Sequence, residues 1–303
     1  MHCHFIRAGV VGKHIYYHAD CVRAGKSLSV WTVQAKQPVD IIFSATISFA
    51  RDNTGERKAL RHQSLPSPSV WASRPPSELR EDTDSRLLSA TSQKDSGHVV
   101  ESVRVPRTLC DEDTPSTTRL WQWIRACSVQ SNIIGGGLEM TDGSRAAHLA
   151  ALAYISDHYF IGTVPRIHRA GRFIGASSIL QIKQSIDAST SLGKKKLQLF
   201  QKLSNEELED NAGPGRSTAN SHAGVTNTVE MMVTLNHTIF FHNPKDIRAD
   251  DWLLVEAETP WAGDDRGVVI QRIWTSDKVL VATCVQEGII RLQQDEAVPK
   301  SKM

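Results

Sequence analysis

Asp157 is the residue whose position in the sequence most clearly offers chemistry. It follows a run of small and apolar residues that ends at Ile155. A carboxylate with an ordinary pKa of about 4 is a weak base at neutral pH. Desolvation beside an apolar helix raises that pKa, which makes the carboxylate a more effective general base. Position alone also fits a solvated aspartate at a helix end, which is the more frequent situation for this residue type.

Other sequence features are weaker indications of a functional site. Gly135–Gly137 fits a flexible loop better than a phosphate-binding loop, because no Lys-Ser/Thr pair follows it. Lys194–Lys196 offers charge to a phosphate, although a solvated helix face is the more common role of such a run. His14 and His18 share one face of an expected strand, but two histidines are too few for a metal site, so we expect no metal and no cofactor. The absence of a Gly-x-Ser-x-Gly motif disfavours a serine α/β-hydrolase.

The composition excludes several classes of protein. The formal net charge of the 303 residues is +2, so we expect no binding to nucleic acid or to an anionic membrane surface. No apolar run reaches the roughly 18 residues of a membrane-spanning helix. The five cysteines are scattered and odd in number, which favours a reducing compartment over a disulfide framework.

Strand patterns dominate both ends of the chain. Segments rich in Val, Ile, Phe, Tyr and Trp, separated by short turn signals, predict strands, and their short connections predict an antiparallel meander. The predicted strands of the first fifty residues are His2–Ile6, Ile15–Val22, Ser27–Lys36 and Val39–Phe49. The later ones are Trp121–Ala126, Glu230–His242, Trp252–Thr259, Gly267–Thr275 and Val279–Arg291.

The middle of the chain predicts helices and a linker. Asp142 or Ser144 can cap a helix that runs to about Ser156. Because almost every position in this helix is small or apolar, we expect it to be buried on all sides. Lys183–Asp210 predicts a second helix with a charged face. Residues 52–118 are rich in Ser, Pro, Asp, Glu and Arg and predict an inter-domain linker.

The N-terminal and C-terminal strands form an internal repeat. At a constant offset of 237 residues, Ile15 falls on Trp252, Val33 on Ile270 and Phe43 on Leu280. Strands and turns coincide without a gap, as in a duplicated unit. A helix precedes the strands of the second copy only, so we expect the intact gene product to be longer at its N-terminus.

Several separated motifs resemble one known family, the type II acyl-CoA thioesterases. The N-terminal motifs are Phe5-Ile6-Arg7-Ala8-Gly9 and Val22-Arg23-Ala24-Gly25-Lys26-Ser27. The central and C-terminal motifs are His148-Leu149-Ala150-Ala151-Leu152-Ala153-Tyr154-Ile155-Ser156-Asp157, Leu235-Asn236-His237-Thr238-Ile239-Phe240-Phe241-His242 and Val285-Gln286-Glu287-Gly288. The motifs occur in the order of the family, which makes the resemblance specific.

The resemblance implies an α+β double-hotdog fold, in which two antiparallel sheets each wrap a central helix. The first hotdog is then incomplete. The implied organisation is a partial N-terminal hotdog domain at residues 1–51, a partly disordered linker at 52–118, a catalytic hotdog domain at 119–293 and a tail at 294–303.

The resemblance also implies the site and the reaction. The family hydrolyses acyl-CoA with an Asp, a Thr or Ser and a Gln, and the matching residues here are Asp157, Thr234 and Gln286. Asp157 is expected to activate water that Thr234 and Gln286 hold, while direct attack by the carboxylate remains an alternative. Two other functions stay open: a catalytically silent protein that binds acyl-CoA, and an enoyl-CoA hydratase.

The C-terminal tripeptide Ser301-Lys302-Met303 resembles a peroxisomal import address of the Ser-Lys-Leu kind. Together with the family resemblance it predicts the peroxisomal matrix, with the cytoplasm as the alternative location. The expected partners are the acyl-CoA substrate, the peroxisomal import receptor and a second copy of the chain in a homodimer.

Overall fold

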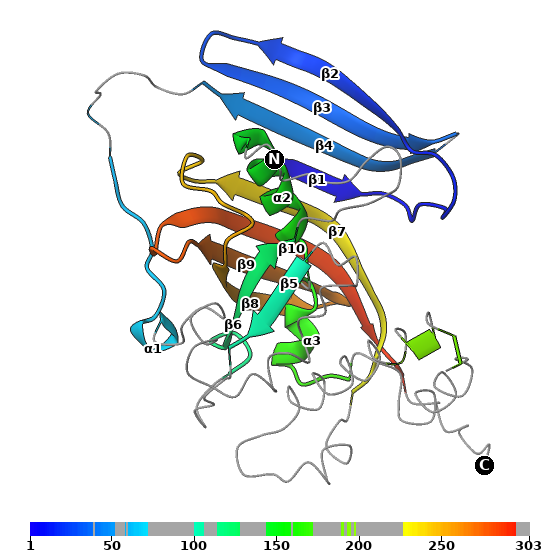
Figure 1. Cartoon of the computed structure of the whole chain (residues 1–303). Helices are drawn as coiled ribbons and strands as arrows, with labels where there is room; N and C mark the ends of the chain where they lie inside the picture. Colours follow the sequence, from blue (N-terminus) through cyan, green and yellow to red (C-terminus); the bar gives the residue numbers. More distant parts are fainter. Residues whose placement is uncertain are drawn as a thin grey trace, which may run out of the picture.

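The computed structural model describes residues 1–38, 40–51, 58, 60–71, 100–105, 114–127, 144–158, 160–171, 189–190, 193–194, 197 and 227–294. These residues form one ten-stranded antiparallel sheet with the strand order β2-β3-β4-β1-β7-β10-β9-β8-β6-β5 (Figure 1). The N-terminal strands are β1 (His2–Phe5), β2 (Tyr16–Ala24), β3 (Leu28–Gln37) and β4 (Asp40–Ala50). The others are β5 (Val100–Arg104), β6 (Arg119–Ala126), β7 (Val229–Phe241), β8 (Leu253–Gly263), β9 (Arg266–Trp274) and β10 (Leu280–Leu292).

The internal repeat reappears in the strand order. The arrangement β2-β3-β4-β1 in the first half matches β8-β9-β10-β7 in the second half, and the two sets meet where β1 pairs with β7. The strands therefore build one continuous sheet through this central pair. The expected strands agree with the observed ones to within a few residues, and the largest difference is at the end of β8, which runs to Gly263 instead of Thr259. Strand β5 was not expected.

Strand β1 departs from a simple meander. It pairs with β4 and β7 instead of β2, so that Cys3 lies opposite both Ala45 and His237. The connection from β1 to β2 is long enough for this crossing, and Gln37 fixes it. The Gln37 side chain accepts a hydrogen bond from Val10 N at 2.7 Å and donates one to Val10 O at 3.0 Å.

Among the residues that the structure describes, the sheet is accompanied by the helices α1 (Pro68–Trp71), α2 (Arg145–Ile155) and α3 (Thr163–Ile167). Helix α2 begins at the expected cap, where Ser144 Oγ accepts a hydrogen bond from Ala147 N at 3.2 Å. Helices α2 and α3 contact the C-terminal half of the sheet, whereas β2 is exposed at every residue. None of the helices among the described residues has the length and apolar character needed to cross a membrane.

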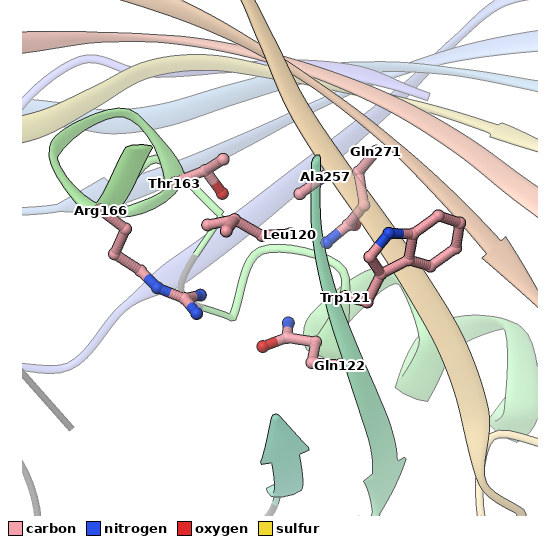
Figure 2. A pocket seen from close by; sticks show the side chains of 7 residues that line it. All are labelled: Leu120, Trp121, Gln122, Thr163, Arg166, Ala257 and Gln271. Carbon is pink, nitrogen blue, oxygen red and sulfur yellow. The ribbon is translucent and has the colours of Figure 1, made fainter. Parts of the chain in front are cut away.

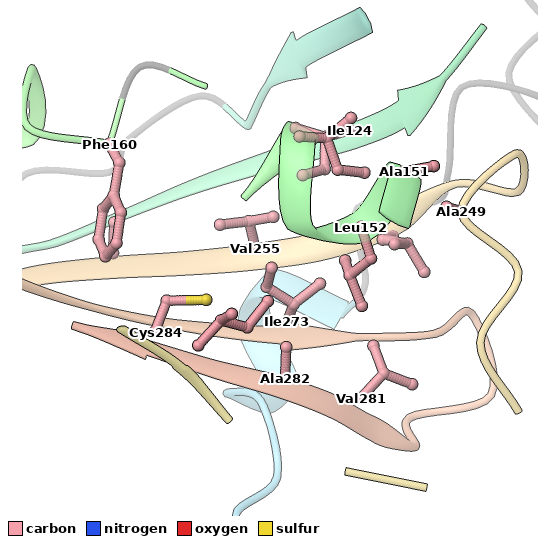
Figure 3. Packing of buried hydrophobic residues seen from close by; sticks show 14 of the residues in the cluster. Ile124, Ala151, Leu152, Phe160, Ala249, Val255, Ile273, Val281, Ala282 and Cys284 are labelled. Carbon is pink, nitrogen blue, oxygen red and sulfur yellow. The ribbon is translucent and has the colours of Figure 1, made fainter. Parts of the chain in front are cut away.

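The expectation that α2 is buried on all sides is wrong. Only the stripe formed by His148, Ala151, Leu152 and Ile155 is buried, and Tyr154 is 59% exposed. The helix lies on one face of the sheet, so a single stripe can meet the core. Figure 3 shows Ala151 and Leu152 of this stripe packed against side chains of β6, β8, β9 and β10 in the hydrophobic core.

Some expectations concern segments that the structure covers only in part. Helix α1 and strand β5 fall inside residues 52–118, and β5 pairs with β6 as the outermost strand of the sheet. The predicted helix at Lys183–Asp210, apart from a few isolated residues, and the loop at Gly135–Gly137 lie outside the described residues. So do Ser301, Lys302 and Met303.

Candidate active site

Asp157 and Gln286 meet beneath the C-terminal end of α2. Asp157 follows the last helical residues of α2, and Gln286 lies on β10 with its side chain fully buried. Gln286 Nε2 donates a hydrogen bond to Asp157 Oδ1. The other polar atom of this amide, Gln286 Oε1, is buried and has no hydrogen-bond partner among the described residues. The structure thus joins two of the three residues that the family resemblance selected.

The surroundings of Asp157 change its acidity in the direction that general-base catalysis requires. Burial raises the pKa of Asp157 above its ordinary value, and the hydrogen bond from Gln286 opposes part of this shift. Desolvation penalises the charged carboxylate, because few dipoles replace the lost water. A carboxylate with a raised pKa accepts a proton more readily from water.

Thr234 reaches the same face of the sheet because β7 contains a bulge. Gln286 lies opposite His237, but Gly288 lies opposite Thr234, so that β7 has one extra residue between these two pairs. Directly opposed residues share a face, and side chains alternate along a strand. The extra residue therefore brings both His237 and Thr234 to the face of Gln286, although they are three positions apart.

Gly288 allows the segment after α2 to lie close to this bulge. A Cβ atom at residue 288 would stand 2.6 Å from Ile161 Cγ1 and 2.8 Å from Val233 O. Neither approach is compatible with a normal side chain, and the second atom belongs to the backbone. The glycine thus lets the chain that follows Asp157 pack directly onto β7 and β10.

His237 forms the second polar contact at this end of α2. Its side chain is 2% exposed, and its Nε2 lies 3.0 Å from Ser156 Oγ. Burial lowers the pKa of His237 to about 4, with smaller contributions from the N-terminal amine and His2, so the imidazole is neutral at physiological pH. The ring also contacts Phe160 edge-on, with 5.5 Å between centroids.

Two buried thiols flank the polar residues. Burial raises the pKa of Cys3 to about 11 and that of Cys284 to about 12, and the Asp157 carboxylate adds to both shifts. Cys3 Sγ donates to His237 O at 3.3 Å. Both cysteines are therefore neutral thiols at physiological pH, and neither is a nucleophile of the thiolate kind.

A small cavity lies near α3, apart from these residues. Figure 2 shows polar and apolar side chains turned toward it from β6, α3, β8 and β9. The residues that line it are Leu120, Trp121, Gln122, Thr163, Arg166, Ala257 and Gln271. None of them is Asp157, Thr234 or Gln286, so the cavity is separate from the candidate site.

Sequence reasoning did not single out Ser156 and His237 as parts of the site. Both lie inside motifs quoted above: Ser156 immediately precedes Asp157, and His237 follows Leu235 by two positions. The sequence signal that could have identified them is that a polar residue at the end of an apolar helix, and a histidine in an apolar strand, are both expected to be buried and therefore to need a hydrogen-bond partner. Their contact depends on a strand 81 residues further along the chain, which local patterns do not reveal.

The family models that match this chain, and two related proteins, all carry the description acyl-CoA thioesterase. A family model described as the acyl-CoA thioesterase C-terminal domain matches residues 75–290, and one described as the N-terminal domain matches residues 1–50. The chain is 29% identical over 318 residues to acyl-coenzyme A thioesterase 8 of Mus musculus, covering 100% of this chain and 75% of the relative. It is 28% identical over 306 residues to the protein of the same name from Homo sapiens, with the same coverage of both chains.

A solved structure supports the fold. The crystal structure of the acyl-CoA thioesterase II TesB2 from Mycobacterium marinum superposes with a TM-score of 0.57 at 21% sequence identity. The match covers 96% of this chain and 79% of that chain.

Proposed function

The chain belongs to the acyl-CoA thioesterase family, whose members are thioester hydrolases, and on that premise we propose that Asp157 activates the water that attacks the thioester. The observation that carries the proposal is the part-buried hydrogen bond between Gln286 Nε2 and Asp157 Oδ1. It combines a carboxylate of raised pKa with an amide that fixes its orientation. The substrate is an acyl-CoA, and the products are a free fatty acid and CoA.

The polar atoms around Asp157 provide contacts for a water molecule. Gln286 Oε1, buried without a partner in the described part of the chain, can accept one hydrogen of the water while Asp157 accepts the other. Thr234, on the same sheet face, can offer its hydroxyl to the water oxygen. Three groups then orient one water, which reduces the entropic cost of attack.

The reaction follows from this arrangement. The water oxygen bonds to the thioester carbonyl carbon as its proton passes to Asp157, and the carbonyl electrons form an oxyanion. The oxyanion collapses and the C–S bond breaks. CoA leaves as a thiolate, which is a good leaving group because thiols are much stronger acids than alcohols. The thiolate then takes up a proton, and Asp157 returns to its ionised form.

The pH dependence of hydrolysis tests the role of Asp157 as the base. The base acts in its deprotonated form, so kcat/KM is expected to rise with pH through the raised pKa of Asp157. The midpoint of this acid limb is expected above the ordinary aspartate value of about 4. Thiol release from an acyl-CoA, measured between pH 4 and 9, gives the profile. A midpoint at or below about 4 would argue against a desolvated base.

The architecture of the family suggests the finer organisation of this chain. We infer a double hotdog, with an N-terminal domain at residues 1–51, a linker at 52–118, a catalytic domain at 119–293 and a tail at 294–303. The repeat of strand order about the β1–β7 pair and the N-terminal domain match at residues 1–50 support the separation of the first domain from the rest. The C-terminal domain match begins at residue 75, within the proposed linker. Hotdog sheets commonly associate, so a homodimer is the proposed assembly.

The location proposed for the enzyme is the peroxisomal matrix. Support comes from Ser301-Lys302-Met303, which resembles a peroxisomal address read by the import receptor. A fluorescent protein fused ahead of the full chain is expected to appear in peroxisomes. Deletion of the last three residues is expected to leave the fusion in the cytosol, and unchanged peroxisomal fluorescence would contradict the proposal.

A further inference from the structure

Two consecutive residues at the end of α2 are held by two residues that face each other across neighbouring strands. Ser156 contacts His237 on β7, and Asp157 contacts Gln286 on β10. His237 and Gln286 are directly opposed in the β7–β10 ladder. The spacing of an opposed strand pair, about 5 Å between Cα atoms, is close to the 3.8 Å between consecutive residues. One contact therefore influences the geometry of the other.

The hydrogen bonds of Ser156 identify the tautomer of His237. The hydroxyl of Ser156 donates its single hydrogen to Ala153 O at 2.9 Å. Its oxygen must then accept from His237, whose Nε2 lies 3.0 Å away. His237 is consequently protonated on Nε2, and Nδ1 carries a lone pair that has no partner among the residues described.

A role in packing alone does not account for this histidine. Its buried Nδ1 acceptor is unsatisfied in the described part of the chain, which is unfavourable for stability. An apolar side chain of similar size, such as leucine, would fill the same space beside Phe160 without that cost. What leucine would lose is the N–H donor to Ser156.

We propose that His237 is a positioning residue, which holds Ser156 through its Nε2–H and thereby keeps the adjacent Asp157 against Gln286. The proposal deepens the proposed function and rests on Asp157 being the base. Ser156 is the C-cap of α2, and its backbone N–H donates to Leu152 O at 2.9 Å. A shift of this cap would move the Asp157 carboxylate relative to the water and the thioester, and a misplacement of about 1 Å is enough to slow a reaction strongly.

Two substitutions at residue 237 separate positioning from packing. His237→Leu keeps the volume and removes the donor, whereas His237→Gln places an amide N–H near the position of Nε2. We expect His237→Leu to lower kcat about 10-fold with KM changed less than about threefold, and His237→Gln to stay within about threefold of the wild type. Thiol release gives kcat and KM, and thermal unfolding gives Tm for each variant.

His148→Leu is the matched control. His148 is also 2% exposed and belongs to the first turn of α2, whereas Asp157 follows the other end of the helix. Its Nδ1 accepts from Ala249 N at 3.3 Å and lies 3.5 Å from Asp250 Oδ1, so its contacts do not involve Ser156 or Gln286. This variant is expected to lower Tm while kcat stays within about threefold of the wild type. The comparison shows whether losing a buried histidine by itself reduces turnover.

Ser156→Ala provides a second route to the same answer if His237→Leu fails to fold. This substitution removes the hydroxyl oxygen that accepts from His237 and changes the side-chain volume only slightly. We expect kcat to fall about 10-fold. In the double variant the two losses are expected to be less than additive, because both act on one contact. Turnover close to that of the wild type in His237→Leu or Ser156→Ala would overturn the proposal. So would equal loss in His237→Leu and His237→Gln.

The failure of this proposal is distinguishable from the failure of the proposed function. If Asp157→Asn retains full turnover, the assignment of the base is wrong, whatever the histidine variants do. If Asp157→Asn is inactive and both His237→Leu and Ser156→Ala keep normal kcat, only the positioning role is wrong.

Discussion

Replacement of Asp157 by Asn is expected to lower kcat about 100-fold or more. Asparagine has nearly the same shape, and its carbonyl oxygen can still accept the hydrogen bond from Gln286 Nε2. It cannot take a proton from water at neutral pH, so the general base is lost. Thiol release from an acyl-CoA measures kcat and KM. We expect KM to change little, since the change removes a proton acceptor and leaves the shape of the site intact.

Stability measurements distinguish lost chemistry from lost structure in this variant. Because the pKa of Asp157 is raised in the folded chain, its ionised form destabilises the fold at pH values above the unfolded pKa of about 4. The neutral amide removes that cost, so Tm at neutral pH is expected to be equal to or higher than that of the wild type. Asp277→Asn, at an exposed turn residue, is the control and should keep full activity. Turnover by Asp157→Asn close to the wild-type rate would reject Asp157 as the base.

Replacement of Gln286 by Leu is expected to lower kcat about 10- to 100-fold. Leucine occupies a similar volume in a fully buried position but removes both the donor to Asp157 and the acceptor proposed for water. The hydrogen bond from Gln286 lowers the pKa of Asp157, so its loss raises that pKa further. The acid limb of kcat/KM is therefore expected to move to higher pH in this variant.

Gln271→Leu is the matched control for the glutamine. Gln271 is 1% exposed and lies on β9, where it pairs with Cys284 of β10. Its side chain lines the cavity near α3 and does not contact Asp157. We expect this variant to keep kcat within about threefold of the wild type. An acid limb of Gln286→Leu at the wild-type pH would show that Gln286 does not act on the carboxylate.

The sequence revealed the strands well because their signals are local. Enrichment in β-branched and aromatic residues, together with turn residues, located most strands of both halves to within a few residues. The start of α2 was equally accessible, since Ser144 caps it through a contact only three residues away. These features depend on neighbouring residues, which a single sequence displays directly.

Features that depend on distant partners were not accessible in the same way. The insertion of β1 between β4 and β7 brings Cys3 beside His237, which follows it by 234 positions. The bulge that turns Thr234 toward Gln286 is defined by pairing with β10, and the contact of Ser156 with His237 requires the completed sheet. The exposed side of α2 was misjudged because small apolar residues do not reveal whether a second layer covers them.

The most direct test of Asp157 as a desolvated general base is a single-turnover measurement. Enzyme in excess is mixed rapidly with an acyl-CoA, and CoA release is followed for the wild type and Asp157→Asn, so that product release does not limit the rate. The account predicts that the chemical rate of Asp157→Asn is lower by a factor of about 100 or more, while the amount of acyl-CoA bound before reaction is unchanged. Equal single-turnover rates in the two proteins would contradict it.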